Sequence, residues 1–213
     1  MTSIAFYVQI VKALEEIGAP YMIVGAFGGY AFGLSRATYD IDILVDLREQ
    51  DFEALSQKFP LPRYYADPEM MRNSTEMGIM FNIIDTGEGV KADLVPLRRE
   101  PEYRLAFERR VCRQFTAPSG ENFEAWVARP TDIIIGKLYA WNEGRSNKHP
   151  NDIYSMLVFD MSGFSDSKID YELVLAKASS IGEETHQMWE QLLARAQEEL
   201  KKHGVIRSQG IRE

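Results

Sequence analysis

The hydrophobic pattern of this chain changes its period twice, and these changes constrain the fold more than any other feature. Between residues 4 and 17 apolar side chains recur at about 3.6-residue spacing, which predicts an amphipathic helix. Short apolar runs typical of strands follow at residues 21–24, 40–46 and 90–95. From Pro130 onward the helical period returns. The pattern predicts an α/β (α+β) fold, with a mixed sheet followed by a helical C-terminal part.

Local signals predict further elements. Small and aromatic side chains in residues 26–34 indicate a closely packed helix, and residues 49–59 carry apolar side chains on one helical side. Residues 77–84 and 90–95 flank a glycine-rich turn, which predicts a β-hairpin. Thr131 is expected to cap the first helix of the C-terminal part.

The same pattern predicts two domains. The first is expected over residues 1–115 and the second, which is helical, over residues 116–213, with the junction around residues 114–130. Residues 183–203 form a long charged helix whose apolar side is expected to pack on the core or on a second subunit. A homodimer is therefore one candidate assembly.

Composition excludes several classes of protein. The 213 residues carry a net charge of -8, which argues against non-specific coating of a polyanion. A local excess of arginine between residues 98 and 113 is either an RNA contact or a solvated helix face. The single cysteine, Cys112, excludes a disulfide framework and fits a reducing compartment. With no signal-peptide pattern and no apolar run of about 18 residues, we expect a cytoplasmic protein without a membrane partner.

A strand that runs into a glycine turn suggests a phosphate site. Residues 21–24 lead directly into Gly25 and Ala26 at the start of a predicted helix. A helix start offers free backbone N–H groups and the positive end of the helix dipole. Glycine at the turn allows an anion to approach the backbone closely. Gly25 and Ala26 are therefore candidate phosphate-binding residues.

Three aspartates suggest a metal site. Asp40 and Asp42 lie two apart in a strand, so both carboxylates point to the same face. Asp93 begins a second apolar strand and joins the pair if the two strands are neighbours. Oxygen ligands without His or Cys favour Mg²⁺ or Mn²⁺ over zinc. Such a triad beside a phosphate site suits two-metal phosphoryl chemistry.

Together these residues resemble the DNA polymerase β-like nucleotidyltransferase superfamily. The matching segments are Gly25-Ala26, Arg36-x-Thr38-x-Asp40-Ile41-Asp42 and Asp93. Downstream, residues 131–138 and 144–153 are similar to the lysine-bearing helix and the basic-then-Asp segment of its minimal bacterial branch. That branch includes the abortive-infection toxins of type IV toxin–antitoxin systems. The resemblance covers roughly residues 5 to 160.

The resemblance implies a polymerase β-like catalytic domain over residues 1–115, completed by the helical domain. The implied reaction moves a nucleoside monophosphate from an NTP to an acceptor hydroxyl. Asp40, Asp42 and Asp93 would be the metal ligands, and Asp93 would also activate the hydroxyl. The nucleotide would be bound by Gly25, Ala26, Arg36, Thr38 and Lys137. The implied acceptor is a tRNA 3′ end, with a protein or a small molecule next, and an antitoxin is a candidate partner.

Other interpretations of the same residues stay open. An Asp-x-Asp pair alone is typical of a solvated strand end, and Lys137 alone is typical of a surface lysine. Arg36 and Thr38 are alternatively residues that shape the loop before the strand. Ala26 stands where relatives have Gly or Ser, so no serine hydroxyl is offered to a phosphate. The alternatives to an enzyme are a non-catalytic nucleotide- or RNA-binding protein and a dimeric interaction protein.

Overall fold

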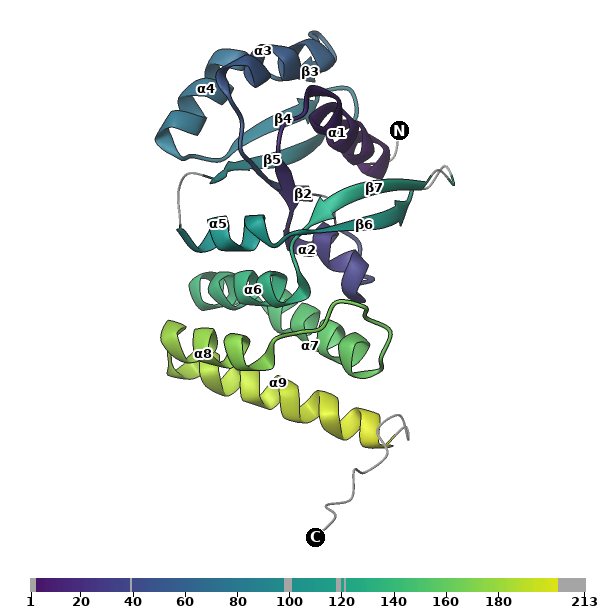
Figure 1. Ribbon diagram of the computed structural model, residues 1–213, viewed down its shortest axis with the longest axis vertical. Coiled ribbons are helices and arrows are strands. Elements are labelled where there is room, and N and C mark those ends of the chain that lie inside the picture. Colours follow the sequence, from purple (N-terminus) through teal and green to yellow (C-terminus); the bar gives the residue numbers. More distant parts are fainter. Residues whose placement is uncertain (1–2, 39, 98–100, 118–119, 121, 203–213) are drawn as a thin grey trace. The chain divides into compact units, whose positions relative to one another are not determined.

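The computed structural model describes residues 3–38, 40–97, 101–117, 120 and 122–202 (Figure 1). The described residues cluster into two compact units. Unit 1 is drawn from Met1–Gly28 and Arg36–Ala128, and unit 2 from Gly29–Ser35 and Arg129–Glu213. Each unit has its own packed interior.

Unit 1 is built on a seven-stranded mixed sheet with the strand order β3-β4-β5-β2-β1-β7-β6. The pairs β2–β5 and β1–β7 are parallel, and the other neighbours are antiparallel. Its strands are β1 (Tyr21–Ile23), β2 (Asp40–Val45), β3 (Tyr64–Tyr65), β4 (Phe81–Asp85), β5 (Val90–Pro96), β6 (Val111–Thr116) and β7 (Asn122–Val127). Its helices are α1 (Ser3–Ile17), α2 (Gly25–Gly29, the last residue in unit 2), α3 (Glu49–Lys58), α4 (Pro68–Met77) and α5 (Pro101–Glu108). The predicted mixed sheet is confirmed.

The side chains of the central strand β2 alternate between an apolar face of the sheet and a polar one. Ile41 and Ile43 are fully buried, and their register partners on β5 are the equally buried Ala92 and Leu94. The helix α1 contacts β5 and α3, and α4 contacts β4, β5 and α3 (Figure 1). Because side chains alternate along a strand, Asp40 and Asp42 point away from the isoleucine face. The apolar packing of one face therefore fixes the acids on the other.

The predicted hairpin is confirmed as β4 and β5, but its first strand begins later than expected. Residues 77–80 precede the strand, because Met77 ends the helix α4 and Gly78 caps it in the left-handed region at φ 66°. The start signals of α4 are present in the sequence. Asp67 accepts hydrogen bonds from the backbone N–H groups of Glu69 and Met70, and Pro68 occupies the first turn.

The segment at residues 114–130, expected as a junction, contains most of a second hairpin. β6 and β7 pair antiparallel, and β7 adds to the sheet beside β1. The backbone N–H of Ala128 donates to the carbonyl of Ile23 at 2.9 Å, which holds the end of β7 against β1. The strands β6 and β7 therefore belong to the sheet of unit 1, which ends at Ala128 rather than at the predicted boundary of residue 115.

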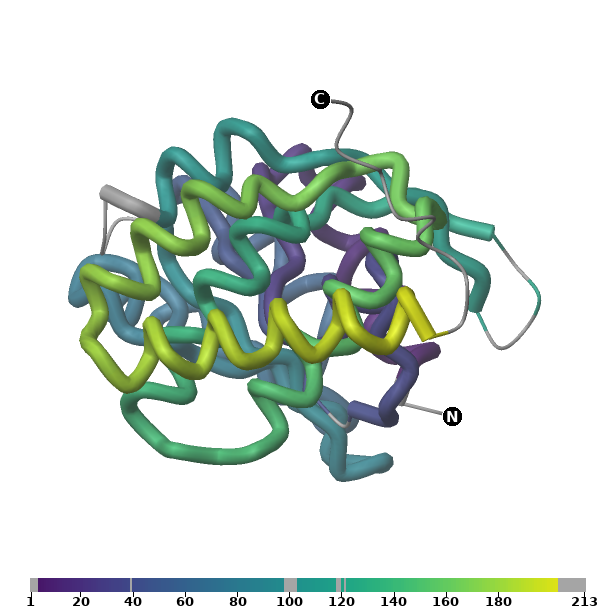
Figure 2. The backbone as a smooth tube through the Cα atoms, turned by 90° about the horizontal axis from the view of Figure 1, so that it is seen from below, coloured from purple at the N-terminus to yellow at the C-terminus, as the bar shows by residue number. Residues whose placement is uncertain are grey.

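Unit 2 is helical, as predicted. It contains η1 (Tyr30–Phe32, a 3₁₀ turn), α6 (Pro130–Gly144), α7 (Lys148–Met161), α8 (Tyr171–Ile181) and α9 (Glu183–Lys202). α6 packs on α7 and α8, and the long α9, yellow in Figure 2, packs on α7 and α8. The buried side of α9 includes Met188, Trp189, Ala196 and Leu200.

The first helix of unit 2 does not begin as predicted. Its N-cap is Arg129, Pro130 lies in the first turn, and Thr131 is already inside the helix. The Thr131 hydroxyl instead accepts a hydrogen bond from the backbone N–H of Asp170 at 2.9 Å. Thr131 thus ties α6 to the start of α8 rather than capping α6.

The predicted helix over residues 26–34 is interrupted. α2 ends at Gly29, a 3₁₀ turn follows, and Gly33 adopts φ 92° in the left-handed region. A Cβ at Gly33 would overlap the ring of Phe159 on α7. This close packing explains why residues 29–35 belong to unit 2 although they precede β2 in sequence.

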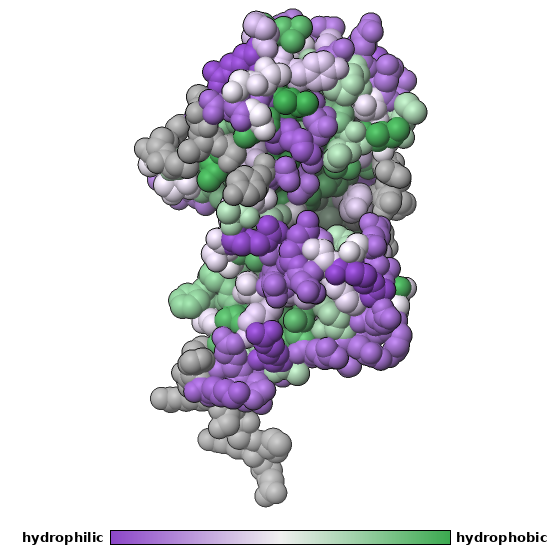
Figure 3. Space-filling view, turned by 180° about the vertical axis from the view of Figure 1, so that it is seen from behind, coloured by the Kyte–Doolittle hydropathy of each residue, from purple (hydrophilic) through white to green (hydrophobic). Residues whose placement is uncertain are grey.

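Hydrophilic side chains cover much of the face shown in Figure 3, with apolar side chains interspersed. Among the helices of the described residues, none has the length and apolar character needed to cross a membrane.

Candidate active site

Two of the three candidate acids face each other across a parallel strand pair. In the β2–β5 register Asp42 is the partner of Asp93, and Asp40 is the partner of Lys91. Neighbouring strands lie about 4.8 Å apart, so partner side chains on one face are close neighbours. The sequence condition that the two acidic strands be adjacent is therefore met, and the three acids share the polar face of the sheet.

Asp93 is the most constrained of the three acids. Its side chain is only 10% exposed, and both carboxylate oxygens accept from the Lys91 ammonium, at 2.8 and 2.9 Å. Asn82, its register partner on β4, donates from Nδ2 to Asp93 Oδ1 at 2.5 Å. Two donors on neighbouring positions of the same face thus fix the orientation of this carboxylate.

The ammonium of Lys91 lies in a strongly negative field. Its pKa is raised, first by the hydrogen bond to Asp93 and then by the charges of Asp93, Asp40 and Asp42, while burial acts in the opposite direction. All three acids therefore lie within electrostatic reach of one cation.

The glycine turn lies directly against Asp42. The backbone N–H of Val24 donates to the Asp42 carbonyl at 2.9 Å, so the end of β1 is held beside this acid. Gly25 follows with φ 64°, a left-handed conformation that favours glycine. A Cβ at Gly25 would lie 3.1 Å from Asp42 Cγ and would overlap Oδ2. Both the backbone conformation and the contact therefore require glycine, and Ala26 behind it is buried.

Arg36 and Thr38 lie in the segment that leads into β2. Thr38 Oγ1 donates to the carbonyl of Asp40 at 3.2 Å, and Arg36 Nη1 donates to the carbonyl of Ala37 at 3.3 Å. These local bonds fit the loop-shaping interpretation. Arg36 is exposed at the surface of this segment.

Lys137 belongs to the interior of unit 2. It is 5% exposed, and its ammonium forms an ion pair of 2.6 Å with Asp152 on α7, which is 2% exposed. The interpretation of Lys137 as an ordinary surface lysine is therefore wrong. The basic-then-Asp segment that follows α6 supplies the buried partner of this lysine.

The donor atoms of the polar face suit a hard divalent cation. Asp40, Asp42 and Asp93 offer only carboxylate oxygens, which Mg²⁺ and Mn²⁺ prefer. Over the part of the chain that the structure describes, no three His, Cys, Asp or Glu side chains are already gathered at metal-ligand spacing. In this arrangement a lysine ammonium, rather than a third carboxylate, lies against Asp93. The oxygen donor set is thus of the kind that a divalent cation prefers, and the Lys91 ammonium occupies the position against Asp93.

Two residues of this site were not predicted from the sequence. Lys91 lies two positions before Asp93 in the same strand, so strand alternation alone could have placed it on the acidic face. Asn82 had no such signal. It meets Asp93 only through the β4–β5 register, which the hairpin loop sets.

The arginine-rich stretch is partly structural. The guanidinium of Arg110 stacks on the rings of Phe107 and Trp126, at 4.3 and 5.0 Å from their centroids. Such stacking uses the flat cation to cover apolar surface. Arg98 and Arg99, which open the stretch, lie outside the described residues.

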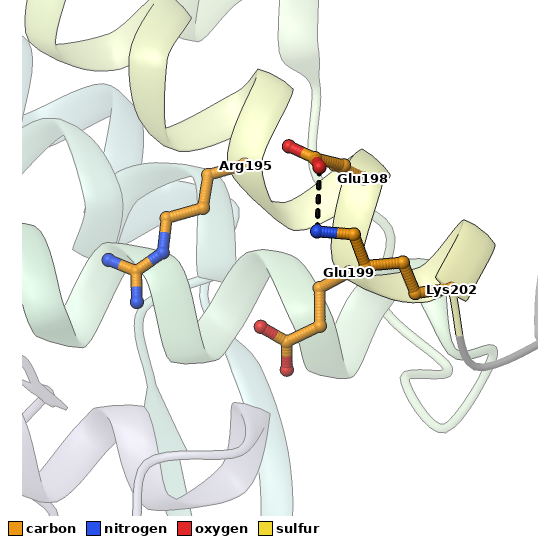
Figure 4. A pocket seen from close by; sticks show the side chains of 4 residues that line it. All are labelled: Arg195, Glu198, Glu199 and Lys202. Carbon is orange, nitrogen blue, oxygen red and sulfur yellow. Dashed lines mark ion pairs between the residues drawn. The ribbon is translucent and has the colours of Figure 1, made fainter.

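A shallow hollow of about 400 Å³ lies on unit 2, along one side of α9 (Figure 4). Its lining consists of Arg195, Glu198, Glu199 and Lys202, and Lys202 pairs with Glu198 at 2.7 Å. Arg195 lies over the ring of Tyr154, 4.3 Å from its centroid. The charges are mixed, Glu199 accepts a hydrogen bond from the Tyr154 hydroxyl of α7, and none of the candidate acids lines this hollow.

The fold is a mixed α/β unit followed by helices. The solved structures to which this chain is similar are nucleotidyltransferase-fold proteins. No family model and no curated protein matches the sequence.

Three solved structures illustrate the similarity. ANT(2")-Ia in complex with adenylyl-2"-tobramycin is 15% identical, with 85% of this chain and 97% of that chain covered and a TM-score of 0.49. An antigenic nucleotidyltransferase-like protein from Paracoccidioides brasiliensis is 14% identical, with 93% and 90% covered and a TM-score of 0.45. The lincosamide antibiotic adenylyltransferase LnuA, lincomycin-bound, is 12% identical, with 73% and 96% covered and a TM-score of 0.37.

Proposed function

We propose that this protein is a metal-dependent nucleotidyltransferase that moves a nucleoside monophosphate from an NTP to an acceptor hydroxyl. The observation that carries the proposal is the meeting of three features on one sheet face. Asp42 faces Asp93 in register, Asp40 shares their face, and a glycine turn with φ 64° lies against Asp42. A solvated strand end would need neither the glycine contact nor a second acid in register.

In this proposal Asp40, Asp42 and Asp93 hold Mg²⁺ or Mn²⁺. When bound, the cation lowers the pKa of the attacking hydroxyl and stabilises charge on the phosphates. Asp93 is the proposed base, because it is nearly buried and held in one orientation by Asn82. Its carboxylate would accept the proton of the acceptor hydroxyl as the new phosphoester bond forms and pyrophosphate leaves.

The proposed nucleotide-binding residues are Gly25, Ala26, Arg36, Thr38 and Lys137. At the left-handed turn of Gly25 the Asp42 carboxylate occupies the space that a side chain would fill, so the proposed phosphate contact is to backbone N–H groups beside this acid. Arg36 is exposed and can offer a bidentate contact to a phosphate. Lys137 is included on the resemblance, and in unit 2 its ammonium is paired with Asp152.

The acceptor is the finer part of the proposal. A tRNA 3′ end is our first candidate, on the resemblance to the toxin branch, and a protein hydroxyl and an aminoglycoside-type small molecule follow. Each offers the nucleophilic hydroxyl that the reaction needs. On the same resemblance, an antitoxin is the proposed partner.

The test is transfer from α-labelled NTPs, each of the four offered separately with Mg²⁺. Total cellular RNA, a protein extract and a panel of aminoglycosides serve as acceptors. Asp42→Asn is the inactive variant, and Asp46→Asn is its matched control, because Asp46 is an exposed acid that directly follows the same strand. We expect label in one acceptor class with the wild type and with Asp46→Asn, and none with Asp42→Asn.

Two results would overturn the proposal. One is transfer by a folded Asp42→Asn protein at the wild-type rate, which would remove Asp42 from the chemistry. The other is absence of transfer to every acceptor class together with calorimetry that detects no binding of Mg²⁺·NTP.

A further inference from the structure

Lys91 places a positive charge among the three acids. Its ammonium contacts both oxygens of Asp93, at 2.8 and 2.9 Å. On β2 its register partner is Asp40, and Asp93 is the partner of Asp42. The cation therefore lies on the same face as all three acids, in contact with the most buried of them.

The two partners of this ion pair differ in freedom. The Lys91 side chain is 43% exposed, whereas that of Asp93 is 10% exposed and is also held by Asn82. A lysine on a flexible four-carbon chain can swing into solvent at little cost. The carboxylate cannot follow it. Displacement of the ammonium would therefore leave the acids in place.

The charge balance favours such a displacement. Three carboxylates and one ammonium leave a formal charge of about -2 on this face. Like charges held close together repel, so this net negative charge is unfavourable. A divalent cation carries twice the charge of the lysine and can contact several oxygens at once.

We infer that Lys91 is a built-in counterion, which balances the charge of the acids when no metal is bound and which a divalent cation must displace in order to bind. This inference rests on the proposed metal site. Lys91 is in this sense a positioning residue that weakens metal affinity. Removal of its charge should strengthen binding of the metal, whereas removal of an ordinary structural ion pair should weaken binding or leave it unchanged.

The experiment is a titration of the full-length chain with Mn²⁺ alone, in which electron paramagnetic resonance measures the free ion. We expect Lys91→Met to bind Mn²⁺ about tenfold more tightly than the wild type, which corresponds to about 1.4 kcal/mol. Lys91→Arg keeps the charge and should bind with nearly the wild-type affinity. Thermal unfolding establishes that each variant is folded.

Lys58→Met is the matched control. Lys58 belongs to the same unit, is 44% exposed and pairs with Glu16. The substitution changes the net charge by the same amount as Lys91→Met, so long-range electrostatics are matched. Mn²⁺ affinity should stay at the wild-type value.

The outcomes separate this inference from the proposed function. Wild-type binding of Mn²⁺ with no tighter binding by Lys91→Met would overturn the counterion role and leave the metal site intact. Equal tightening by Lys91→Met and Lys58→Met would also overturn it, because net charge alone would then explain the gain. No Mn²⁺ binding by any folded variant would overturn both the inference and the metal site.

Discussion

The close approach of Gly25 to Asp42 gives a sharp test of how the site is built. In Gly25→Ala the added Cβ meets two obstacles: a backbone at φ 64° and the Asp42 carboxylate, with Cγ at 3.1 Å and Oδ2 in overlap. Gly18→Ala separates these effects. Gly18 has nearly the same conformation, φ 69°, and no atom lies within 4 Å of an added Cβ.

The expected magnitudes follow from these two terms. The left-handed conformation costs a non-glycine residue about 1–2 kcal/mol, and this is the whole loss expected for Gly18→Ala. Overpacking against a fixed neighbour adds about 1–3 kcal/mol at Gly25. We therefore expect Gly25→Ala to lower the free energy of unfolding by about 2–5 kcal/mol in total. Because the Asp42 carboxylate must move, Gly25→Ala should also lose the proposed nucleotidyl transfer, which Gly18→Ala should keep.

The assay is urea unfolding of both variants and of a double-mutant cycle with Asp42→Ala. Truncation of Asp42 removes the overlapping atoms, so Gly25→Ala should cost less in that background, with a coupling of about 1 kcal/mol or more. Equal losses for Gly25→Ala and Gly18→Ala, or an absence of coupling to Asp42, would refute the claimed contact between the turn and the acid.

Further predictions concern two ion pairs, the buried Lys137–Asp152 pair and the pair of the buried Asp85 with the half-exposed Arg63. Lys137→Met leaves the Asp152 carboxylate buried without this partner, so the free energy of unfolding should fall by about 3–5 kcal/mol in urea titrations. The double variant Lys137→Met with Asp152→Leu should recover much of this loss, because no buried charge is then left. Equal stability of the single variant and the wild type would contradict the pairing. The pKa of Asp85 is lowered, first by its hydrogen bond from Arg63, so this pair stabilises the fold at neutral pH and its contribution is lost as the pH falls below about 4 toward the lowered pKa. Asp85→Asn should therefore melt below the wild type at neutral pH, and the gap should narrow in acid; a gap that stays constant with pH would exclude this linkage.

Much of the fold could be predicted because its signals are local. The 3.6-residue period of α1, the apolar run of β2 and the glycine-rich turn between β4 and β5 are all visible within short windows of sequence. The β6–β7 hairpin was missed because the state of its short strands is settled by what they pack against. β3 and α4 were missed too, although the start signals of α4, Asp67 and Pro68, are local. The predicted cap at Thr131 was wrong because of a tertiary contact: its hydroxyl accepts a hydrogen bond from the backbone N–H of Asp170 instead of capping α6.

The candidate site divides in a similar way. The sequence by itself determined that Asp40 and Asp42 share a face, because strand side chains alternate with a period of two. It also determined that a glycine follows β1, as a turn into a helix requires.

Only the tertiary structure decided which residues meet these acids. The parallel pairing of β2 with β5 aligned Asp42 with Asp93, and the hairpin register brought Asn82 to the same carboxylate. Lys137 was joined to Asp152 inside unit 2 by the packing of α6 on α7. Strand register and helix packing are set by the whole apolar core, and no short window of sequence contains that information.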